Sequence, residues 1–267
     1  MFNKRAINLK KKLAAGEFSP GIWMSLPSPT ACEVIAEAGF DWIVVDAEHS
    51  PFNPETLQYM LMAFKGSDTV PLIRVAWNDH VMIKQALDLG WDGVLVPQVN
   101  NVEDTERAIS ACRYPPAGKR GFGPSRASNY YRDQDEYTRR ANDSVICAIQ
   151  IEDISAAEQI DRIVAVPGID WIFVGRYDMS GALGRLGDID NQQIWNSVHK
   201  IFDVAHAAGI PTSNAVRGIE NIEKTLSLGS QLVTLGEDTA YLKEAVGNAI
   251  KAFHDVIKRK GRRSRNE

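Results

Sequence analysis

Paired cysteines, long apolar runs and an excess of one charge are all missing from this 267-residue chain. The 30 Lys and Arg residues against 34 Asp and Glu leave a formal net charge of −4, which excludes a uniformly basic nucleic-acid-binding surface. No apolar run approaches the roughly 18 residues of a membrane span, and the start lacks the apolar core of a signal peptide. The cysteines number only 3, which indicates free thiols in a reducing compartment. We therefore expect a cytoplasmic protein that binds neither nucleic acid nor a membrane.

What the chain does contain is a repeated phrase. Residues 38–46, 89–97 and 167–175 each place a glycine at the end of an amphipathic segment and then a short apolar run, and residues 228–236 form a weaker copy. The glycine suits the left-handed residue that ends a helix, and the apolar run is typical of a strand buried on both faces of a parallel sheet. A helix–glycine–strand repeat in a chain of this length predicts one (β/α)8 TIM-barrel domain over residues 1–267.

The expected elements follow from this pattern. We expect strands at 21–26, 41–47, 70–76, 93–99, 145–152, 169–176, 210–214 and 231–236. Helical patterns occupy the stretches between them, at 30–38, 54–65, 80–89, 104–112, 156–166 and 194–208. A helix at 5–16 is expected to cap the bottom of the barrel, and a long last helix, about 239–259, carries an apolar stripe suited to packing on a neighbouring subunit. Residues 114–143 form an unusually long Gly- and Pro-containing connection, and the basic tail 258–267 is expected to be disordered and solvated.

Polar residues close four of the apolar strands. Because the strands of a barrel all end on one face, we expect a shared site there. Charged side chains are rarely needed at the edge of an apolar core, since burying an unpaired charge is costly. The residues expected to converge are Asp46, Glu48, His49, Arg74, Gln150, Glu152 and Asp178.

The residue types at these ends indicate a chemistry. Glu152 and Asp178 offer hard oxygen ligands, which suit Mg²⁺ or Mn²⁺ better than Zn²⁺. Arg74 presents a planar fork for a carboxylate or an oxyanion. His49 is the natural general base, and Asp46, three residues earlier, is placed to orient its ring.

Two further absences narrow the reaction. Every lysine lies outside the expected strands, which argues against the imine chemistry of a Schiff-base aldolase. The last two strands lack a Gly-rich phosphate loop, so a phosphorylated substrate is not expected. A carboxylate-binding arginine, a metal pair, a base and no strand lysine together favour enolate chemistry on a 2-oxo acid.

Several motifs resemble those of the HpcH/HpaI aldolases, which are metal-dependent class II pyruvate aldolases. They are residues 46–49, 74–79, 113–121, 150–152 and 174–180, and the similarity runs from about residue 21 to 238. The resemblance implies that Glu152 and Asp178 bind Mg²⁺ or Mn²⁺ (Co²⁺ as a substitute in vitro), with no organic cofactor. It implies that His49 accepts a proton, and that Arg74 stabilises the transition state.

The same resemblance implies how pyruvate is held and how subunits cooperate. Gln150 and the backbone at Tyr177 and Asp178 would bind pyruvate, and Asp88 would reach a neighbouring subunit's site to support its histidine. A homohexamer built from dimers, with the last helix exchanged between subunits, is implied in the same way.

Departures from the family pattern fall on the expected aldehyde side. Ala47 replaces a glycine, Arg176-Tyr177 replaces a proline, and the bulky Phe122 stands in a shortened loop. Asn214 ends the seventh strand, where relatives often carry glycine and aliphatic residues. Trp23, on the first strand, either lines the pocket or fills the top of the barrel. These positions leave the acceptor aldehyde open.

The expected function is reversible cleavage of a 4-hydroxy-2-oxo acid, of sugar-acid or dicarboxylate type, to pyruvate and an aldehyde through a metal-bound pyruvate enolate. A citrate-lyase-type acyl-CoA lyase is the alternative enzyme, because it would share the Glu/Asp metal pair. A catalytically silent barrel kept for binding or assembly is the third possibility, and the intact polar set disfavours it.

Overall fold

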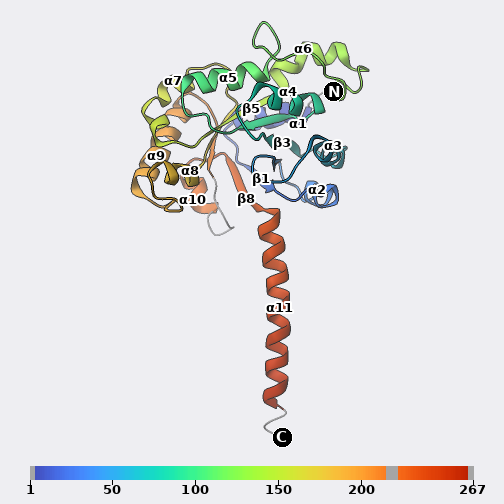
Figure 1. Cartoon of the computed structure of the whole chain (residues 1–267), viewed down its shortest axis with the longest axis vertical. Coiled ribbons are helices and arrows are strands. Elements are labelled where there is room, and N and C mark those ends of the chain that lie inside the picture. Colours follow the sequence, from blue (N-terminus) through green and yellow to red (C-terminus); the bar gives the residue numbers. More distant parts are fainter. Residues whose placement is uncertain (1–3, 215–221, 264–267) are drawn as a thin grey trace.

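The computed structural model of the chain describes residues 4–214 and 222–263, the last four of these as backbone only. Eight parallel strands form one sheet in the order β7-β6-β5-β4-β3-β2-β1-β8, surrounded by helices (Figure 1). The predicted (β/α)8 barrel is therefore confirmed. The strands are β1 (Ser19–Met24), β2 (Trp42–Asp46), β3 (Val70–Arg74), β4 (Gly93–Val96), β5 (Ile146–Ile151), β6 (Trp171–Val174), β7 (Thr212–Asn214) and β8 (Leu232–Glu237).

Helix α1 (Lys4–Ala14) closes the N-terminal end of the barrel, as predicted. Its residues Ala6, Leu9 and Leu13 join the apolar cluster that fills the barrel interior. The outer helices are α2 (Pro29–Ala36), α3 (Pro54–Ala63), α4 (His80–Leu89), α5 (Val102–Cys112), α7 (Ile160–Val164), α8 (Arg176–Ala182), α9 (Gln192–Ala207) and α10 (Ile222–Ser227).

Alternate strand residues belong to two separate cores. In β2, Trp42 and Val44 face the barrel interior, whereas Ile43 and Val45 pack against the surrounding helices. Successive side chains of a strand point to opposite faces, so the next inward position of β2 is Asp46. This alternation, repeated in β3 and β5, sends the polar strand-end residues into the mouth of the barrel.

Three expected elements differ in detail. The predicted helix at 156–166 is divided into the short 3₁₀ helix η1 (Ile154–Glu158) and α7. The long connection predicted at 114–143 is partly helical, because it includes α6 (Gln134–Ser144). Tyr137 and Ala141 of this helix are buried in a small apolar cluster with Tyr114 and Ala127 of the same connection. Helix α11 (Asp238–Arg263) continues through part of the basic tail that was expected to be disordered, and residues 264–267 of that tail lie outside the described residues.

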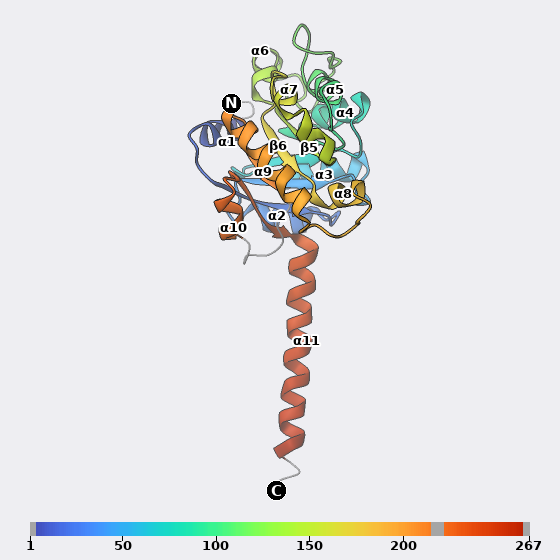
Figure 2. The ribbon, with the colours of Figure 1, turned by 90° about the vertical axis from the view of Figure 1, so that its left-hand side faces the viewer.

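The two ends of the barrel carry different structures. Helix α11 leaves from the end of β8 and projects away from the barrel, whereas α6 and the long connection lie at the opposite end (Figures 1 and 2). That opposite end receives the C-termini of the outer helices, because each helix runs antiparallel to the strands. Over the described residues, none of the helices combines the length and the low polarity that a membrane span requires.

Candidate active site

The centre of the site is a forked ion pair between neighbouring strands. Asp46 and Arg74 are register partners at the ends of β2 and β3. Arg74 Nε donates to Asp46 Oδ1 at 2.9 Å, and Arg74 Nη2 donates to Oδ2 at 2.8 Å. Both side chains are largely buried. Two parallel hydrogen bonds fix the plane of the guanidinium as well as its position.

The remaining edge of the Arg74 guanidinium faces the middle of the mouth. Arg74 Nη1 lies 3.1 Å from Glu48 Oε2 and 3.5 Å from Gln150 Oε1. Its Cζ lies 4.6 Å from the centroid of the Trp23 ring, which itself packs on Phe173 at 5.4 Å. Trp23 therefore packs against the apolar cluster of the barrel interior and supports the Arg74 guanidinium from below.

Glu152, directly after β5, is held in place from several sides. Its Oε2 accepts the backbone N–H of Gln98 at 2.7 Å, and its Oε1 accepts Gln150 Nε2. Asn100 Oδ1 accepts the backbone N–H groups of Glu152 and Asp153 at 2.8 and 2.9 Å. The sequence analysis missed Gln98 and Asn100, although both follow β4 in the same way as the predicted site residues follow their strands.

Gly175 makes room for this carboxylate. A Cβ at Gly175 would lie 2.9 Å from Glu152 Cγ and 3.2 Å from Glu152 Oε1. Gln98 adopts a left-handed backbone conformation, φ 56°, to point its N–H at Glu152. A residue other than glycine pays a conformational cost there, and such strain is typical of functional sites.

Three acidic side chains share the mouth. Burial raises the pKa of Glu152 to about 7, and the charges of Glu48 and Asp178 add to the shift. Burial also raises the pKa of Glu48 to about 7; Arg74 lowers it, and Asp46 and Asp178 raise it. Asp178 itself lies in the exposed first turn of α8. Negative charge therefore accumulates around Glu152 when Glu48 and Asp178 are ionised.

That charge and the oxygen donors fit a divalent cation. Over residues 4–214 and 222–259, no three His, Cys, Asp or Glu side chains are close enough to enclose a metal ion. Glu152 and Asp178 could supply two carboxylate oxygen donors, the kind of ligand that hard divalent cations prefer.

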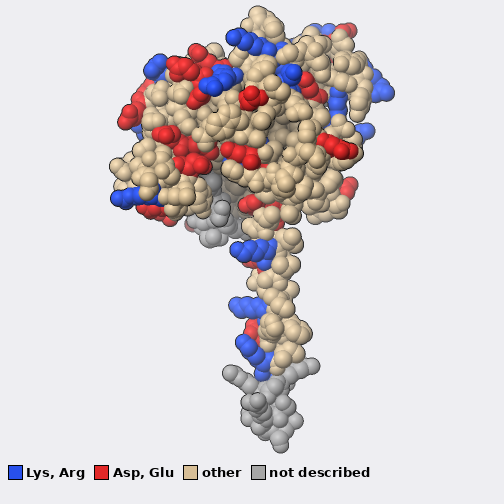
Figure 3. All heavy atoms as spheres, in the orientation of Figure 1, with Lys and Arg blue, Asp and Glu red and all other residues tan. Residues whose placement is uncertain are grey.

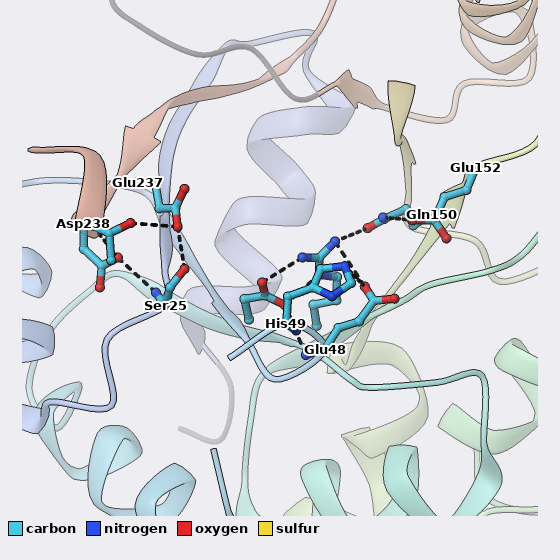
Figure 4. A network of polar contacts seen from close by, with 10 residues as sticks. Ser25, Glu48, His49, Gln150, Glu152, Glu237 and Asp238 are labelled. Atoms are coloured by element: carbon cyan, nitrogen blue, oxygen red, sulfur yellow. Dashed lines mark hydrogen bonds and ion pairs between the residues drawn. The ribbon is translucent and has the colours of Figure 1, made fainter. Parts of the chain in front are cut away.

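His49 lies at the edge of this cluster with little support. Its side chain is 64% exposed, and its Nε2 lies 3.7 Å from Glu48 Oε2. Asp46 does not orient the His49 ring, contrary to the prediction. It accepts the backbone N–H groups of Glu48 and His49 at 3.1 and 3.3 Å, and both of its oxygens bind Arg74. The oppositely charged guanidinium on the next strand binds this carboxylate more strongly than an exposed imidazole could. Figure 4 shows Glu48, His49, Gln150 and Glu152 in one polar network.

A second polar network joins β1 to the start of α11. Ser25 Oγ donates to Glu237 Oε1 at 2.6 Å, and the Ser25 backbone N–H donates to Asp238 Oδ1 at 3.0 Å (Figure 4). Glu237 pairs in register with Trp23, which places it on the inner face of β8. The sequence analysis did not single out Glu237, whose position at a strand end could have indicated it.

Residues 176–178 lie at the start of α8. Tyr177 and Asp178 are exposed, but Arg176 is buried. Its Cζ lies 4.6 Å from the Trp195 ring of α9 and its Nη1 3.6 Å from Asp190. Arg176, which stands in place of part of the family's usual motif, therefore packs α8 against α9 through its guanidinium.

Asn214 was expected on the aldehyde side of the substrate site, but its register directs it away from the barrel interior. It pairs with Val174, an outward-facing residue of β6. It also shares a face with Thr212, whose hydroxyl contacts His206 of α9 at 2.7 Å. Period-two alternation therefore directs Asn214 toward the helices.

Asp88 and Phe122 lie at the far end of the barrel. Asp88 is in the last turn of α4, and Phe122 belongs to the connection that follows α5. Neither side chain can reach the mouth of its own barrel, because the helices end on the opposite face from the strands. Phe122 is 53% exposed and packs on Tyr114, with ring centroids 5.3 Å apart.

A parallel (β/α)8 barrel with a carboxylate-rich mouth and a forked arginine at its centre has the architecture of an enzyme active site. The chain matches the HpcH/HpaI aldolase/citrate lyase family over residues 20–245 and belongs to it. It is 36% identical over 244 residues to a 5-keto-4-deoxy-D-glucarate aldolase of Enterobacter sp. (strain 638), covering 91% of this chain and 95% of that protein. It is accordingly a carbon–carbon lyase of the aldolase type.

Solved structures show the same relationship. A HpcH/HpaI aldolase/citrate lyase family protein from Burkholderia cenocepacia J2315 superposes with a TM-score of 0.88 at 28% identity, covering 92% of this chain and 99% of that one. The citrate synthase SbnG superposes with a TM-score of 0.83 at 31% identity, covering 92% and 97%. Barrels similar to this one thus carry names of more than one carbon–carbon bond reaction.

Proposed function

We propose that this protein catalyses the reversible, divalent-metal-dependent cleavage of a 4-hydroxy-2-oxo acid to pyruvate and an aldehyde. The observation that carries the proposal is the Arg74 guanidinium, held flat by Asp46 and Trp23 and directed at the Glu48–Gln150–Glu152 cluster. A rigid guanidinium beside a carboxylate pair suits a 2-oxo acid whose negative charge grows during the reaction. The glucarate-derived substrate named for the 36% identical relative supports a sugar-acid type of substrate.

Glu152 and Asp178 would hold the cation, with Mg²⁺ or Mn²⁺ as the preferred ions. When bound, the metal supplies Lewis acidity toward the 2-oxo group. Gln150 and the backbone N–H groups at the start of α8, near Tyr177 and Asp178, would bind the carboxylate of the 2-oxo acid. The donors at this end of the site therefore fix the pyruvate half of the substrate.

The proton transfers fall to His49. Its Nε2 removes the proton from the 4-hydroxyl group, the C3–C4 bond breaks, and the aldehyde leaves. The electron pair passes to the pyruvate half, where Arg74 stabilises the enolate oxygen until C3 is protonated. Glu48, 3.7 Å from His49 Nε2, would stabilise the imidazolium between these steps.

The test is pyruvate release coupled to lactate dehydrogenase. A panel of 4-hydroxy-2-oxo acids is assayed after chelation and after return of Mg²⁺ or Mn²⁺, with citryl-CoA and malyl-CoA as a second panel. Metal-dependent pyruvate release from the first panel supports the proposal. Cleavage confined to the acyl-CoA esters would establish the alternative, an acyl-CoA lyase. If neither panel is cleaved, the remaining hypothesis is a catalytically silent barrel that serves binding or assembly.

The same assay mixture tests the absence of an imine. All lysines of the described chain lie outside the strand ends, so borohydride with pyruvate should leave the protein mass unchanged. A pyruvyl adduct on any lysine would contradict the metal-dependent route.

We also propose that the enzyme is a homo-oligomer, a hexamer built from dimers, with α11 packed on a neighbour. Helix α11 stands clear of its own barrel, and one side of it is free of charge along most of its length (Figure 3). Leu242, Val246, Ile250, Phe253 and Ile257 lie along this helix and are each more than half exposed. An apolar stripe of this length is seldom left in water. In this assembly Asp88 and Phe122 would serve a neighbouring copy's mouth. Light scattering at assay concentration tests it, and an active monomer would refute it.

A cytoplasmic location is part of the proposal. All three cysteines of the chain are free and buried, and none forms a disulfide. Free thiols are typical of reducing compartments.

A further inference from the structure

The N-terminal end of the barrel contains a fully buried arginine. The Arg120 side chain is 0% exposed, and its Nη2 donates to Asp88 Oδ1 at 2.7 Å. Its Cζ lies 4.5 Å from the centroid of the Tyr114 ring. Burying a guanidinium is costly unless its charge is compensated, and Asp88 is the carboxylate that compensates it.

The surroundings of Arg120 are neutral. The Tyr114 and Tyr137 hydroxyls lie 2.9 Å apart, and burial raises the pKa of both phenols, so both stay protonated. The connection is also tight: the Arg120 backbone N–H donates to Arg113 O at 2.9 Å. A Cβ at Gly118 would lie 2.5 Å from that same oxygen. Arg120 is therefore fixed by packing, and its position determines that of Asp88.

Asp88 has only one oxygen engaged. Its Oδ1 binds Arg120, while its Oδ2 takes part in no hydrogen bond within the described residues, and the side chain is 24% exposed. A carboxylate in the last turn of a helix is disfavoured by the helix dipole, and the positive charge of Arg120 offsets this cost. Gly123 lies beside this oxygen, since a Cβ at Gly123 would be 4.0 Å from Asp88 Oδ2, an ordinary van der Waals distance.

The exposed His49 has no hydrogen-bonded carboxylate partner within the described residues of its own chain, whereas Asp88 has a free carboxylate oxygen. Its ring has no carboxylate within hydrogen-bonding distance in the described chain, since Asp46 binds Arg74 and Glu48 stays at 3.7 Å. A histidine that acts as a base is commonly oriented by a carboxylate on its second nitrogen.

We infer that Arg120 is a positioning residue, which holds Asp88 so that its free Oδ2 meets His49 of a neighbouring copy. The inference rests on the proposed function, in which the mouth of one barrel is completed by the far end of another. Arg120 touches no substrate. It acts through Asp88, and its loss should resemble the loss of Asp88.

The first experiment is a double-mutant cycle on pyruvate release. Arg120→Met and Asp88→Asn are each expected to lower kcat by about 10- to 100-fold with little change in KM, as is usual when a partner that orients a reactive side chain is removed. The double variant should be no worse than Asp88→Asn alone, because both changes disable one unit. Arg120→Lys should recover part of the rate, since it restores the charge without the fork.

Arg113→Met is the matched control. Arg113 is also buried at this end of the barrel and also pairs with an aspartate, Asp170, at 3.1 Å. Its substitution should lower Tm without changing kcat, because Asp170 has no part in the mouth of any copy. Light scattering on every variant measures its oligomeric state. It thereby distinguishes a variant that no longer assembles from one that assembles but has lost the contact between Asp88 and His49.

Mixed oligomers provide the second experiment. Chains carrying His49→Ala and chains carrying Arg120→Met are co-expressed with different affinity tags and purified through both. Some mouths then combine an intact His49 from one chain with an intact Arg120–Asp88 pair from the other, and activity should return. Oligomers that mix Arg120→Met with Asp88→Asn should stay impaired, because every pair is damaged.

The outcomes separate the two proposals. A wild-type protein that releases no pyruvate overturns the proposed function and this inference with it. An active enzyme in which Asp88→Asn has no effect overturns the shared site. A slow Asp88→Asn enzyme beside a normal Arg120→Met enzyme, or additive losses in the double variant, overturns the role of Arg120 alone.

Discussion

Two arginine–aspartate pairs, one at each end of the barrel, show how the same residue types serve opposite purposes. At the mouth, both oxygens of Asp46 bind Arg74, and the guanidinium keeps a free edge 3.1 Å from Glu48. At the far end, Arg120 is buried and Asp88 keeps a free oxygen. In the first pair both aspartate oxygens are hydrogen-bonded and the arginine keeps a free edge. In the second the arginine is fully buried and binds one oxygen of the aspartate, which leaves the other aspartate oxygen free within the described chain.

The difference follows from the number of hydrogen bonds that join the two side chains, which is two in the first pair and one in the second. A forked pair fixes the plane of a guanidinium, which matters when that plane must meet a planar substrate. A single bond from a buried arginine leaves its aspartate an acceptor for a third group. The mouth is therefore suited to binding a 2-oxo acid, and the far end to orienting a proton-transfer group.

The largest expected effect comes from removing the metal, which the mouth needs and the far end does not. Chelation should reduce pyruvate release to background, and Mg²⁺ or Mn²⁺ should restore it. Glu152→Gln keeps an acceptor for the Gln98 N–H and removes the charge, so it should abolish the increase in Tm that Mn²⁺ gives the wild type. Arg120→Met should keep that increase. Equal Tm responses of Glu152→Gln and wild type would remove Glu152 from the metal site.

Loss of the base ranks next. His49→Ala is expected to lower kcat for aldol cleavage by about 10²- to 10⁴-fold, the usual contribution of a positioned general base. Steady-state kinetics with one 4-hydroxy-2-oxo acid measure it. The Arg120–Asp88 pair acts through His49, so adding Arg120→Met to His49→Ala should cost nothing more. Cleavage at the normal rate in His49→Ala would exclude His49 from the mechanism.

The comparison between the pairs predicts that an arginine-to-lysine substitution lowers kcat/KM by different amounts in the two pairs. Arg74→Lys should lower kcat/KM by about 10²- to 10³-fold, because an ammonium cannot bind both Asp46 oxygens and still face the substrate. Arg120→Lys should lose much less, since one hydrogen bond to Asp88 is all that is required there. The test is to measure kcat/KM for both variants in parallel. Similar losses in the two variants would contradict the idea that Arg74 itself meets the substrate whereas Arg120 only holds Asp88.

The smallest effect is expected at Phe122. In the proposed assembly this exposed ring borders the aldehyde side of a neighbouring mouth, so Phe122→Ala should change the ratio of kcat/KM between large and small acceptor aldehydes by about 10-fold, as is common for a hydrophobic pocket wall. The rate of pyruvate proton exchange, which needs no aldehyde, should stay unchanged. Tyr130→Ala is the control, because Tyr130 is an exposed aromatic residue in the same connection. An unaltered acceptor ratio in Phe122→Ala would remove this residue from the pocket.

Much of the site was predictable because strand periodicity is a local property. Asp46, Arg74, Gln150 and Glu152 follow inward-facing positions of their strands, and parallel strands end on one face. The same rule could have found Gln98, Asn100 and Glu237, which also follow strands. It could also have placed Asn214 toward the helices. Ser213 contacts Trp171 in the barrel interior and Thr212 contacts His206 of α9, so the alternation directs Asn214 to the same side as Thr212.

By itself, the sequence determined the barrel, the face that bears the chemistry and the set of polar residues on it, because these depend on spacing along the chain. Only the tertiary structure decided which charges pair. Asp46 is three residues from His49, yet it binds Arg74 on the next strand, because Coulomb attraction and hydrogen-bond geometry depend on distance in space. The tertiary structure likewise placed Asp88 beside Arg120 at the far end of the barrel, 32 residues apart in sequence, and left Leu242, Val246, Ile250, Phe253 and Ile257 of α11 each more than half exposed.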